Sequence, residues 1–148
     1  MRLDIKLVDP TLPSPSYQTD GAVAFDLLVR EDTLIEPNKP TLIPLNLIVK
    51  TPPGYFFLLA ARSSLPMKKN LMVANSIGII DQDYCGEEDE IKLQVLNFSK
   101  EPVKVERGER IAQGMLIKID KVDEFVIHDT MSEVSRGGFG STGGHTEK

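Results

Sequence analysis

The chain has 148 residues, 41% of them hydrophobic and 26% charged, and its net charge is −5. This length predicts one domain with its own core, and the negative charge disfavours duplex DNA or RNA as a partner. No apolar run is long enough to span a bilayer and the amino terminus lacks a signal-peptide core, so we expect no membrane partner. The single cysteine, Cys85, excludes an intrachain disulfide and favours a reducing, cytoplasmic location.

Short apolar runs alternate with turns rich in proline and glycine along most of the chain. These runs predict strands over residues 2–8, 22–30, 41–50, 55–61, 103–105, 110–119 and 122–128. A central β-hairpin is predicted as well, with the apolar run 77–80 in one strand and the alternating residues 90–97 in the other. Residues 65–70 leave room for a single helical turn at most. The pattern predicts an all-β fold, a sandwich or a jelly-roll-like barrel.

Polar residues interrupt this pattern at several places. Asp26 lies inside an apolar strand, so it is either buried and paired or reaches solvent at a strand edge. Arg62, with two serines after it, follows a buried strand and has donors suited to phosphate oxygens, although a solvated basic loop gives the same pattern. The hairpin carries an amide, a carboxylate and an aromatic ring in Asn75, Asp81 and Tyr84. These groups suit a nucleobase pocket, and equally a solvated acidic turn.

Two further features concern the second half of the chain. Gln113 lies mid-strand among apolar residues, so its amide needs a partner. From Thr130 the composition becomes polar and glycine-rich, which predicts a single domain 1–148 with a core over 1–129 and a mobile arm over 130–148. Glycines let backbone N–H groups approach phosphates closely, and Phe139 within the glycine run indicates the anchor of a lid.

Five segments stand in order along the chain: residues 24–27, 62–64, 75–86, 108–113 and 136–143. The third contains Gly-Ile-Ile-Asp-Gln-Asp-Tyr-Cys-Gly and the last contains Gly-Gly-Phe-Gly-Ser-Thr-Gly. Together they resemble the five motifs of the trimeric dUTP nucleotidohydrolases (dUTPases), over nearly the whole chain. The resemblance implies a jelly-roll protomer in a homotrimer, with three sites at subunit junctions. It also implies that the C-terminal motif of one subunit closes over a neighbour's site.

The activity that the resemblance implies is hydrolysis of dUTP to dUMP and pyrophosphate, which keeps uracil out of DNA and supplies dUMP. Asp81 would hold the water that attacks the α-phosphorus. Asn75 and the backbone at Ile79 and Ile80 would read the uracil edge, and Tyr84 would pack on the deoxyribose. The implied cofactor is Mg²⁺, held mainly by substrate phosphates and water, with no direct protein ligand.

The remaining positions are carried over in the same way. Lys92 would contact the pyrimidine, Phe139 would stack on the uracil, and Asp26 would have a supporting role. Contacts to the triphosphate would come from Arg62, Ser63, Ser64, Gln113, Arg136, Gly140, Ser141 and Thr142. Two departures stand out: the acidic insertion 87–90, which we expect to bend towards solvent, and Arg136, two residues closer to Phe139 than the family's arginine. We expect Arg136 to reach the γ-phosphate through a flexible arm.

Three other functions compete with this one. A dCTP deaminase, or a bifunctional deaminase and dUTPase, shares the fold, but Gln94 falls where the deaminating glutamate would be, and an amide cannot shuttle the proton. A catalytically idle nucleotide-binding regulator would not need the intact set of Asp81, Asn75 and Tyr84. A capsid-like structural jelly roll would not need the glycine-rich arm.

Overall fold

The computed structural model describes residues 1–138, which contain eleven strands and one short helix. The elements are β1 (Asp4–Leu7), β2 (Phe25–Leu28), β3 (Thr33–Ile35), β4 (Thr41–Pro44), β5 (Leu47–Lys50), β6 (Tyr55–Ala61), α1 (Leu65–Lys69), β7 (Leu71–Val73), β8 (Gly78–Ile80), β9 (Lys92–Asn97), β10 (Val103–Val105) and β11 (Arg110–Lys118). The predicted all-β class is confirmed, and so is the single helical turn. No helix within this part of the chain has the length and apolar composition needed to cross a bilayer.

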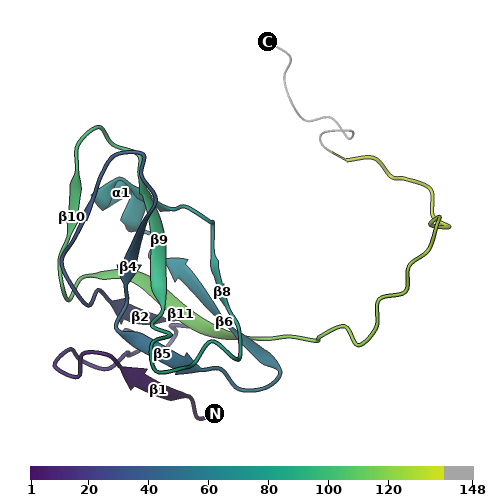
Figure 1. The fold of residues 1–148 in the computed structure, drawn as a ribbon, viewed down its shortest axis with the longest axis horizontal. Coiled ribbons are helices and arrows are strands. Elements are labelled where there is room, and N and C mark those ends of the chain that lie inside the picture. The colour runs from purple at the N-terminus through teal and green to yellow at the C-terminus, as the bar shows by residue number, and fades with distance from the viewer. Residues whose placement is uncertain (139–148) are drawn as a thin grey trace.

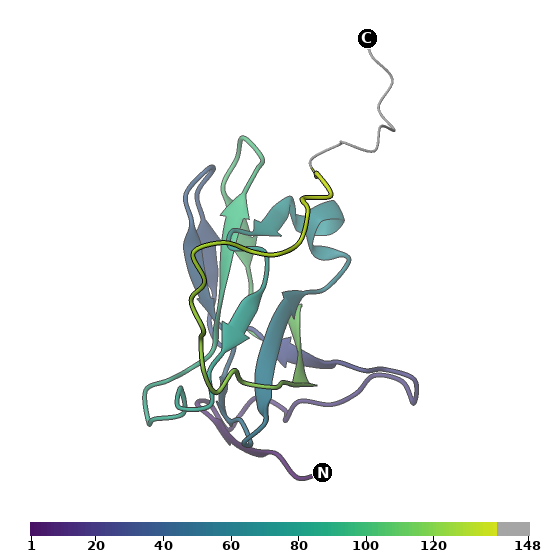
Figure 2. The ribbon, with the colours of Figure 1, turned by 90° about the vertical axis from the view of Figure 1, so that its right-hand side faces the viewer.

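The strands form a four-stranded sheet, a three-stranded sheet and two separate pairs (Figures 1 and 2). The first sheet has the order β2-β11-β6-β8, and the second has the order β4-β9-β7. The remaining pairs are β1 with β5 and β3 with β10, and every pair is antiparallel. The longest pairing joins β6 to β11, from Tyr55 opposite Lys118 to Ala61 opposite Ala112.

The core lies between these sheets. Alternate residues of the strands point into it, among them Leu27 of β2, Phe57 of β6 and Leu93 of β9, each almost fully buried. The ring of Phe57 packs directly against the backbone of β11, where a side chain at Gly114 would place its Cβ 2.1 Å from Phe57 Cζ. Glycine at position 114 therefore leaves room for the Phe57 ring of β6 to lie over the backbone of the neighbouring strand β11.

The predicted central hairpin is wrong. Strand β8 pairs with β6 at the edge of the four-stranded sheet, whereas β9 lies between β4 and β7 in the other sheet. The buried face that the alternation over 90–97 predicts is confirmed, because Ile91, Leu93 and Val95 point into the core. Alternation fixes which face of a strand is buried but not its neighbour, and the turn 81–90 is long enough to carry the chain from one sheet to the other.

Two other strand predictions need correction. The run 41–50 forms two strands, because Asn46 between them adopts a left-handed conformation with φ of 61°. The run 122–128 forms no strand: Phe125 and Ile127 are 85% and 92% exposed, and the segment leads away from the body of the protein (Figure 1). Apolar, β-branched residues favour a strand only where a sheet edge is available to pair with them.

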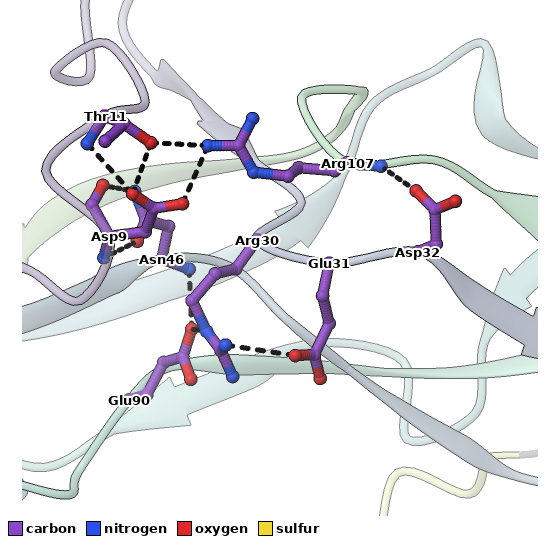
Figure 3. Close-up of polar contacts among 8 residues, drawn as sticks. All are labelled: Asp9, Thr11, Arg30, Glu31, Asp32, Asn46, Glu90 and Arg107. Carbon is purple, nitrogen blue, oxygen red and sulfur yellow. Dashed lines mark hydrogen bonds and ion pairs between the residues drawn. The ribbon is translucent and has the colours of Figure 1, made fainter.

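A polar cluster ties the N-terminal segment to the turn before β11 (Figure 3). Asp9 Oδ1 accepts hydrogen bonds from the backbone N–H and the hydroxyl of Thr11, at 2.9 and 2.5 Å. Arg107 Nη2 donates to Asp9 Oδ2 at 2.7 Å. The Thr11 hydroxyl, and then the Arg107 guanidinium, lower the pKa of Asp9 from 3.8 to about 2. Asn46 completes the cluster by accepting from the Asp9 N–H at 2.6 Å.

This lowered pKa predicts a pH dependence of stability. Because the pKa of Asp9 is lower in the folded state, its ionised form stabilises the fold above about pH 4 and this contribution is lost as the pH falls through about 2. We expect Asp9→Asn to reduce the free energy of unfolding at neutral pH and to flatten its fall between pH 4 and 2. Urea unfolding at a series of pH values measures this. Asp20→Asn, at an exposed loop position, is the control, and parallel pH curves for Asp9→Asn and wild type would contradict the assignment.

Candidate active site

The first group of predicted site residues gathers around Asp26. This carboxylate lies on β2 opposite Gln113 of β11 and is buried. Its Oδ1 lies 3.2 Å from Arg62 Nε, and its Oδ2 lies 3.4 Å from Arg110 Nη1. Of the two interpretations of Asp26, the structure therefore supports the buried and paired one. Both contacts are ion pairs, and Asp26 Oδ2 accepts no hydrogen bond within the described residues, so the two guanidinium groups balance the buried charge by proximity at the end of the four-stranded sheet.

Backbone and amide contacts fix Arg62 in place. Its N–H donates to Ile111 O at 2.9 Å, and its Nη1 donates to Arg110 O at 3.3 Å. Gln113 Nε2 donates to Ala61 O at 2.9 Å, which is the partner that its half-buried amide needs. The end of β6 is thereby locked to the start of β11, and Arg62 does not belong to a loosely solvated loop.

Two cavities flank these arginines. One, of about 140 Å³, is lined by Arg62, Ser64, Lys68, Lys69 and Arg110 together with three further residues. The other, of about 330 Å³, lies on the far side of Arg110 and includes Asp26 and Gln18. Ser64 is the N-cap residue of α1 but makes no side-chain capping bond, and Ser63 is exposed. Cations and hydroxyl donors around a cavity are suited to anionic oxygens.

The second group of predicted residues lies at β8. Asn75 is in the turn between β7 and β8, where Ser76 has a φ of 69°, and Asp81 follows β8 directly. Asn75, Ile79 and Asp81 are exposed, and Tyr84 is 40% exposed. Within residues 1–138, β8 pairs with a strand on one side only. Its outer edge therefore keeps backbone groups that can meet a ligand.

The turn 81–90 is fastened by contacts that the sequence did not predict. Gln82 Nε2 donates to Tyr55 O at 2.8 Å, and the Tyr84 hydroxyl lies 3.4 Å from Glu90 O. The expectation that residues 87–90 bend towards solvent is wrong for Glu90, which is buried and accepts a hydrogen bond from Arg30 (Figure 3). No motif marked this pair, because an acidic residue in an acidic turn resembles a solvated one.

Asp81 of the second group does not lie beside Arg62 of the first within one chain. Ile80 pairs with Phe57, so Asp81 comes level with Phe56, six residues before Arg62 along β6. At about 3.3 Å per residue, roughly 20 Å of strand separates the two positions.

The other predicted residues lie elsewhere. Lys92 is exposed at the start of β9, opposite Pro44 in the three-stranded sheet. Arg136 is exposed beyond the last strand. Phe139, Gly140, Ser141 and Thr142 lie outside the described residues. Among residues 1–138, no three His, Cys, Asp or Glu side chains are grouped so that they could hold a metal ion.

Comparison with known proteins identifies the family. The family model for dUTPase matches residues 11–143. The chain belongs to the dUTPase family. The relatives of this dUTPase include the deoxyuridine 5'-triphosphate nucleotidohydrolases of Helicobacter pylori, 39% identical with 97% of each chain covered, and of Thermobifida fusca, 37% identical with 98% of this chain and 80% of the relative covered.

Solved structures agree with this assignment of the dUTPase fold. The dUTPase of Streptococcus mutans is 31% identical and superposes with a TM-score of 0.74, covering 81% of this chain and 98% of that one. The dUTPase of Staphylococcus bacteriophage 80alpha with dUPNHPP is 25% identical and superposes with a TM-score of 0.81, covering 96% and 98% of the two chains. The family and the jelly-roll-like fold that the motifs predicted are thus confirmed.

The Asp26 cluster of this dUTPase gives a second prediction. Asp26→Asn keeps the shape of the side chain but removes the charge that faces Arg62 and Arg110, so both guanidinium groups lose their ionic partner. We expect the free energy of unfolding to fall by about 1–3 kcal/mol and the affinity for inorganic triphosphate to decrease. Urea unfolding and calorimetric titration measure the two effects. The exposed Asp20→Asn is again the control, and wild-type values for Asp26→Asn in both assays would show that Asp26 does not orient the arginines.

Proposed function

We propose that this dUTPase hydrolyses dUTP to dUMP and pyrophosphate by attack of water on the α-phosphorus. The observation that carries the proposal is the dUTPase family match, which covers residues 11–143. The resemblance in the segment 75–86 supports Asp81 as the catalytic carboxylate. The relatives that are 37–39% identical are deoxyuridine 5'-triphosphate nucleotidohydrolases, and the bacteriophage 80alpha enzyme was solved with dUPNHPP. An exposed carboxylate just after a paired strand is placed to orient and deprotonate a water molecule.

The phosphate end of the proposed site is built from the arginine cluster. Arg62 and Arg110, held by Asp26, offer guanidinium donors to the charge that builds up on the departing pyrophosphate. Lys68 and Ser64 line the same cavity. Fixed donors of this kind stabilise the transition state because they need little reorganisation when the charge develops.

We propose Mg²⁺ as the cofactor, bound mainly by phosphate oxygens of the substrate and by water. The carboxylates nearest the phosphate cavity are already paired, Asp26 with two arginines and Glu109 with Lys69 at 2.8 Å. The donor set of the protein therefore suits a metal that arrives with the nucleotide. A dUTPase from phage phi11, 19% identical and similar in fold, coordinates a structural Mg(II) ion. When bound, Mg²⁺ would neutralise charge on the triphosphate.

At the nucleoside end, we propose that Asn75 and the backbone at Ile79 and Ile80 hydrogen-bond the uracil. The outer edge of β8, which pairs with no strand among residues 1–138, supports this assignment, since it leaves backbone donors and acceptors beside Asn75. Lys92 and Phe139 would add contacts to the pyrimidine, and Tyr84 would pack on the deoxyribose. A base whose donors and acceptors do not match this edge leaves buried groups unpaired, which disfavours cytosine.

We further propose that the site is shared between the subunits of a homotrimer. The roughly 20 Å between Asp81 and Arg62 supports this, because a second chain can bring the two ends together. The protein also exposes apolar surface that a second copy would cover. This includes a groove of about 430 Å³ lined by Leu3, Val23, Phe25 and Leu116, and the segment 122–127. The arm over 130–148, with Arg136, Gly140, Ser141 and Thr142 around the triphosphate, would close over a neighbour's site.

The catalytic role of Asp81 gives a third prediction. We expect Asp81→Asn to lower kcat for dUTP by about 10²–10⁴-fold while it leaves the Kd for dUTP nearly unchanged, since the amide keeps the shape of the side chain but cannot take the proton. Pyrophosphate release from dUTP, dCTP, UTP and dTTP measures turnover and selectivity. Asp83→Asn, at an exposed position in the same turn, is the control. Ammonia release from dCTP by the wild type would indicate the deaminase, and absence of any turnover would indicate an idle binder.

Subunit mixing tests the shared site and gives a fourth prediction. Asp81→Asn and Arg62→Ala should each be nearly inactive alone. If one subunit supplies Asp81 and its neighbour supplies Arg62, random reassembly of equal amounts restores both residues in about one site in four. We therefore expect the mixture to regain about a quarter of wild-type activity. A mixture no more active than the mean of its components would place both residues of a site in one chain.

A further inference from the structure

The turn 81–90 carries both Asp81 and Tyr84, and it ends in a buried carboxylate. The Glu90 side chain is 8% exposed, and its Oε1 accepts hydrogen bonds from Arg30 Nε at 2.8 Å and from the backbone N–H of Asn46 at 2.9 Å (Figure 3). The hydrogen bond to Glu90 raises the pKa of Arg30 above its ordinary value. A buried carboxylate with two donors is held to one position, because leaving it unpaired would be costly.

The partners of Glu90 belong to the rigid part of the fold. Arg30 N–H donates to Pro44 O at 3.0 Å, next to the break between β4 and β5. Beside Glu90, the backbone N–H and C=O of Ile91 bond to Leu47 and Leu45, at 2.8 and 3.0 Å. Glu90 therefore lies where the turn joins the core, between the start of β5 and the segment after β2 that contains Arg30.

The rest of the turn is closed mostly on itself. Gly86 N–H donates to Asp89 Oδ2 at 2.7 Å, and Asp89 N–H donates to Gly86 O at 3.2 Å. Glu87 forms an exposed ion pair with Lys6 of β1. Bonds within a turn fix its shape but not its orientation on the protein, so its orientation depends on where it is attached. Apart from the exposed pair of Glu87 with Lys6, which exposure to solvent weakens, the attachments are Gln82, bonded to Tyr55 O, and Glu90.

The position of the Tyr84 ring depends on the attachment at Glu90. Its hydroxyl lies 3.4 Å from the carbonyl oxygen of Glu90, and its ring is 40% exposed beside the proposed nucleoside position. A tilt of the backbone at Glu90 would move that carbonyl and, with it, the ring. The side chain of Glu90 and the ring of Tyr84 are thus linked through one residue of backbone.

We propose that the ion pair between Arg30 and Glu90 positions Tyr84, and that it thereby sets the discrimination of this dUTPase between 2′-deoxyribonucleotides and ribonucleotides. The inference rests on the proposed function, in which Tyr84 packs on the deoxyribose. Glu90 and Arg30 are positioning residues here, since they act through Tyr84 and touch no substrate atom.

Selectivity is the quantity that tests this. For Glu90→Ala and for Arg30→Met we expect the ratio of kcat/KM for dUTP to kcat/KM for UTP to fall at least about tenfold. Glu90→Gln should lose less, because its amide oxygen still accepts from the N–H of Asn46. This ratio does not depend on the fraction of protein that is folded, so a purely structural effect would lower both rates and leave the ratio unchanged.

The matched control is Glu31→Gln. Glu31 is the other partner of Arg30, at 3.0 Å, but it is exposed and does not belong to the turn 81–90. The ratio of kcat/KM for dUTP to kcat/KM for UTP in Glu31→Gln should therefore equal that of the wild type. An unchanged ratio in Arg30→Met and Glu90→Gln would overturn the proposal even if Glu90→Ala fails to fold. Calorimetric affinities for dUTP and UTP give the same comparison without turnover. A wild type that does not hydrolyse dUTP would therefore contradict the proposed function and leave this test intact.

Discussion

The pairing of β6 with β11 is the constraint on which the site depends. Seven consecutive residue pairs join these strands, and Gly114 lets the Phe57 ring pack against them from the core. The end of β6 and the start of β11 hold Arg62 and Arg110 around the carboxylate of Asp26, while β8 on the other side of β6 presents the turn with Asp81. A single sheet thus sets the spacing between Arg62 and Asp81, and this spacing is what supports the proposed sharing of each site between subunits.

Much of this was predictable from the sequence because it depends on local pattern. Alternation identified the buried face of the strand at 91–97, the continuous apolar run at 55–61 indicated an interior strand, and turn residues separated the elements. The five ordered motifs identified the family before any coordinates. The short strands β3 and β7 were not predicted, since three residues carry too little periodicity.

The remaining features depend on contacts between distant residues. The partner of β8 could not be predicted, because an apolar run pairs equally well with any free edge and the wide turn at 81–90 permits both sheets. Glu90 looked like part of a solvated acidic turn, and only the distant Arg30 and the backbone of Asn46 bury it. The segment 122–128 has the composition of a strand, but its pairing is not decided by its own residues. Its exposed apolar side chains are what a neighbouring subunit would have to cover.

The charge distribution explains how an acidic protein can handle a polyanion. A net charge of −5 disfavours attraction of a polyanion by the molecule as a whole, so affinity for a triphosphate must be built locally. Two carboxylates near the phosphate cavity pair with its cations: Asp26 pairs with Arg62 and Arg110, and Glu109 pairs with Lys69. Each pairing fixes the geometry of a positive group and removes a negative charge from the path of the substrate. Asp81 is exposed and lies about 20 Å along the sheet from Arg62, and under the proposed mechanism it is the carboxylate that orients the attacking water.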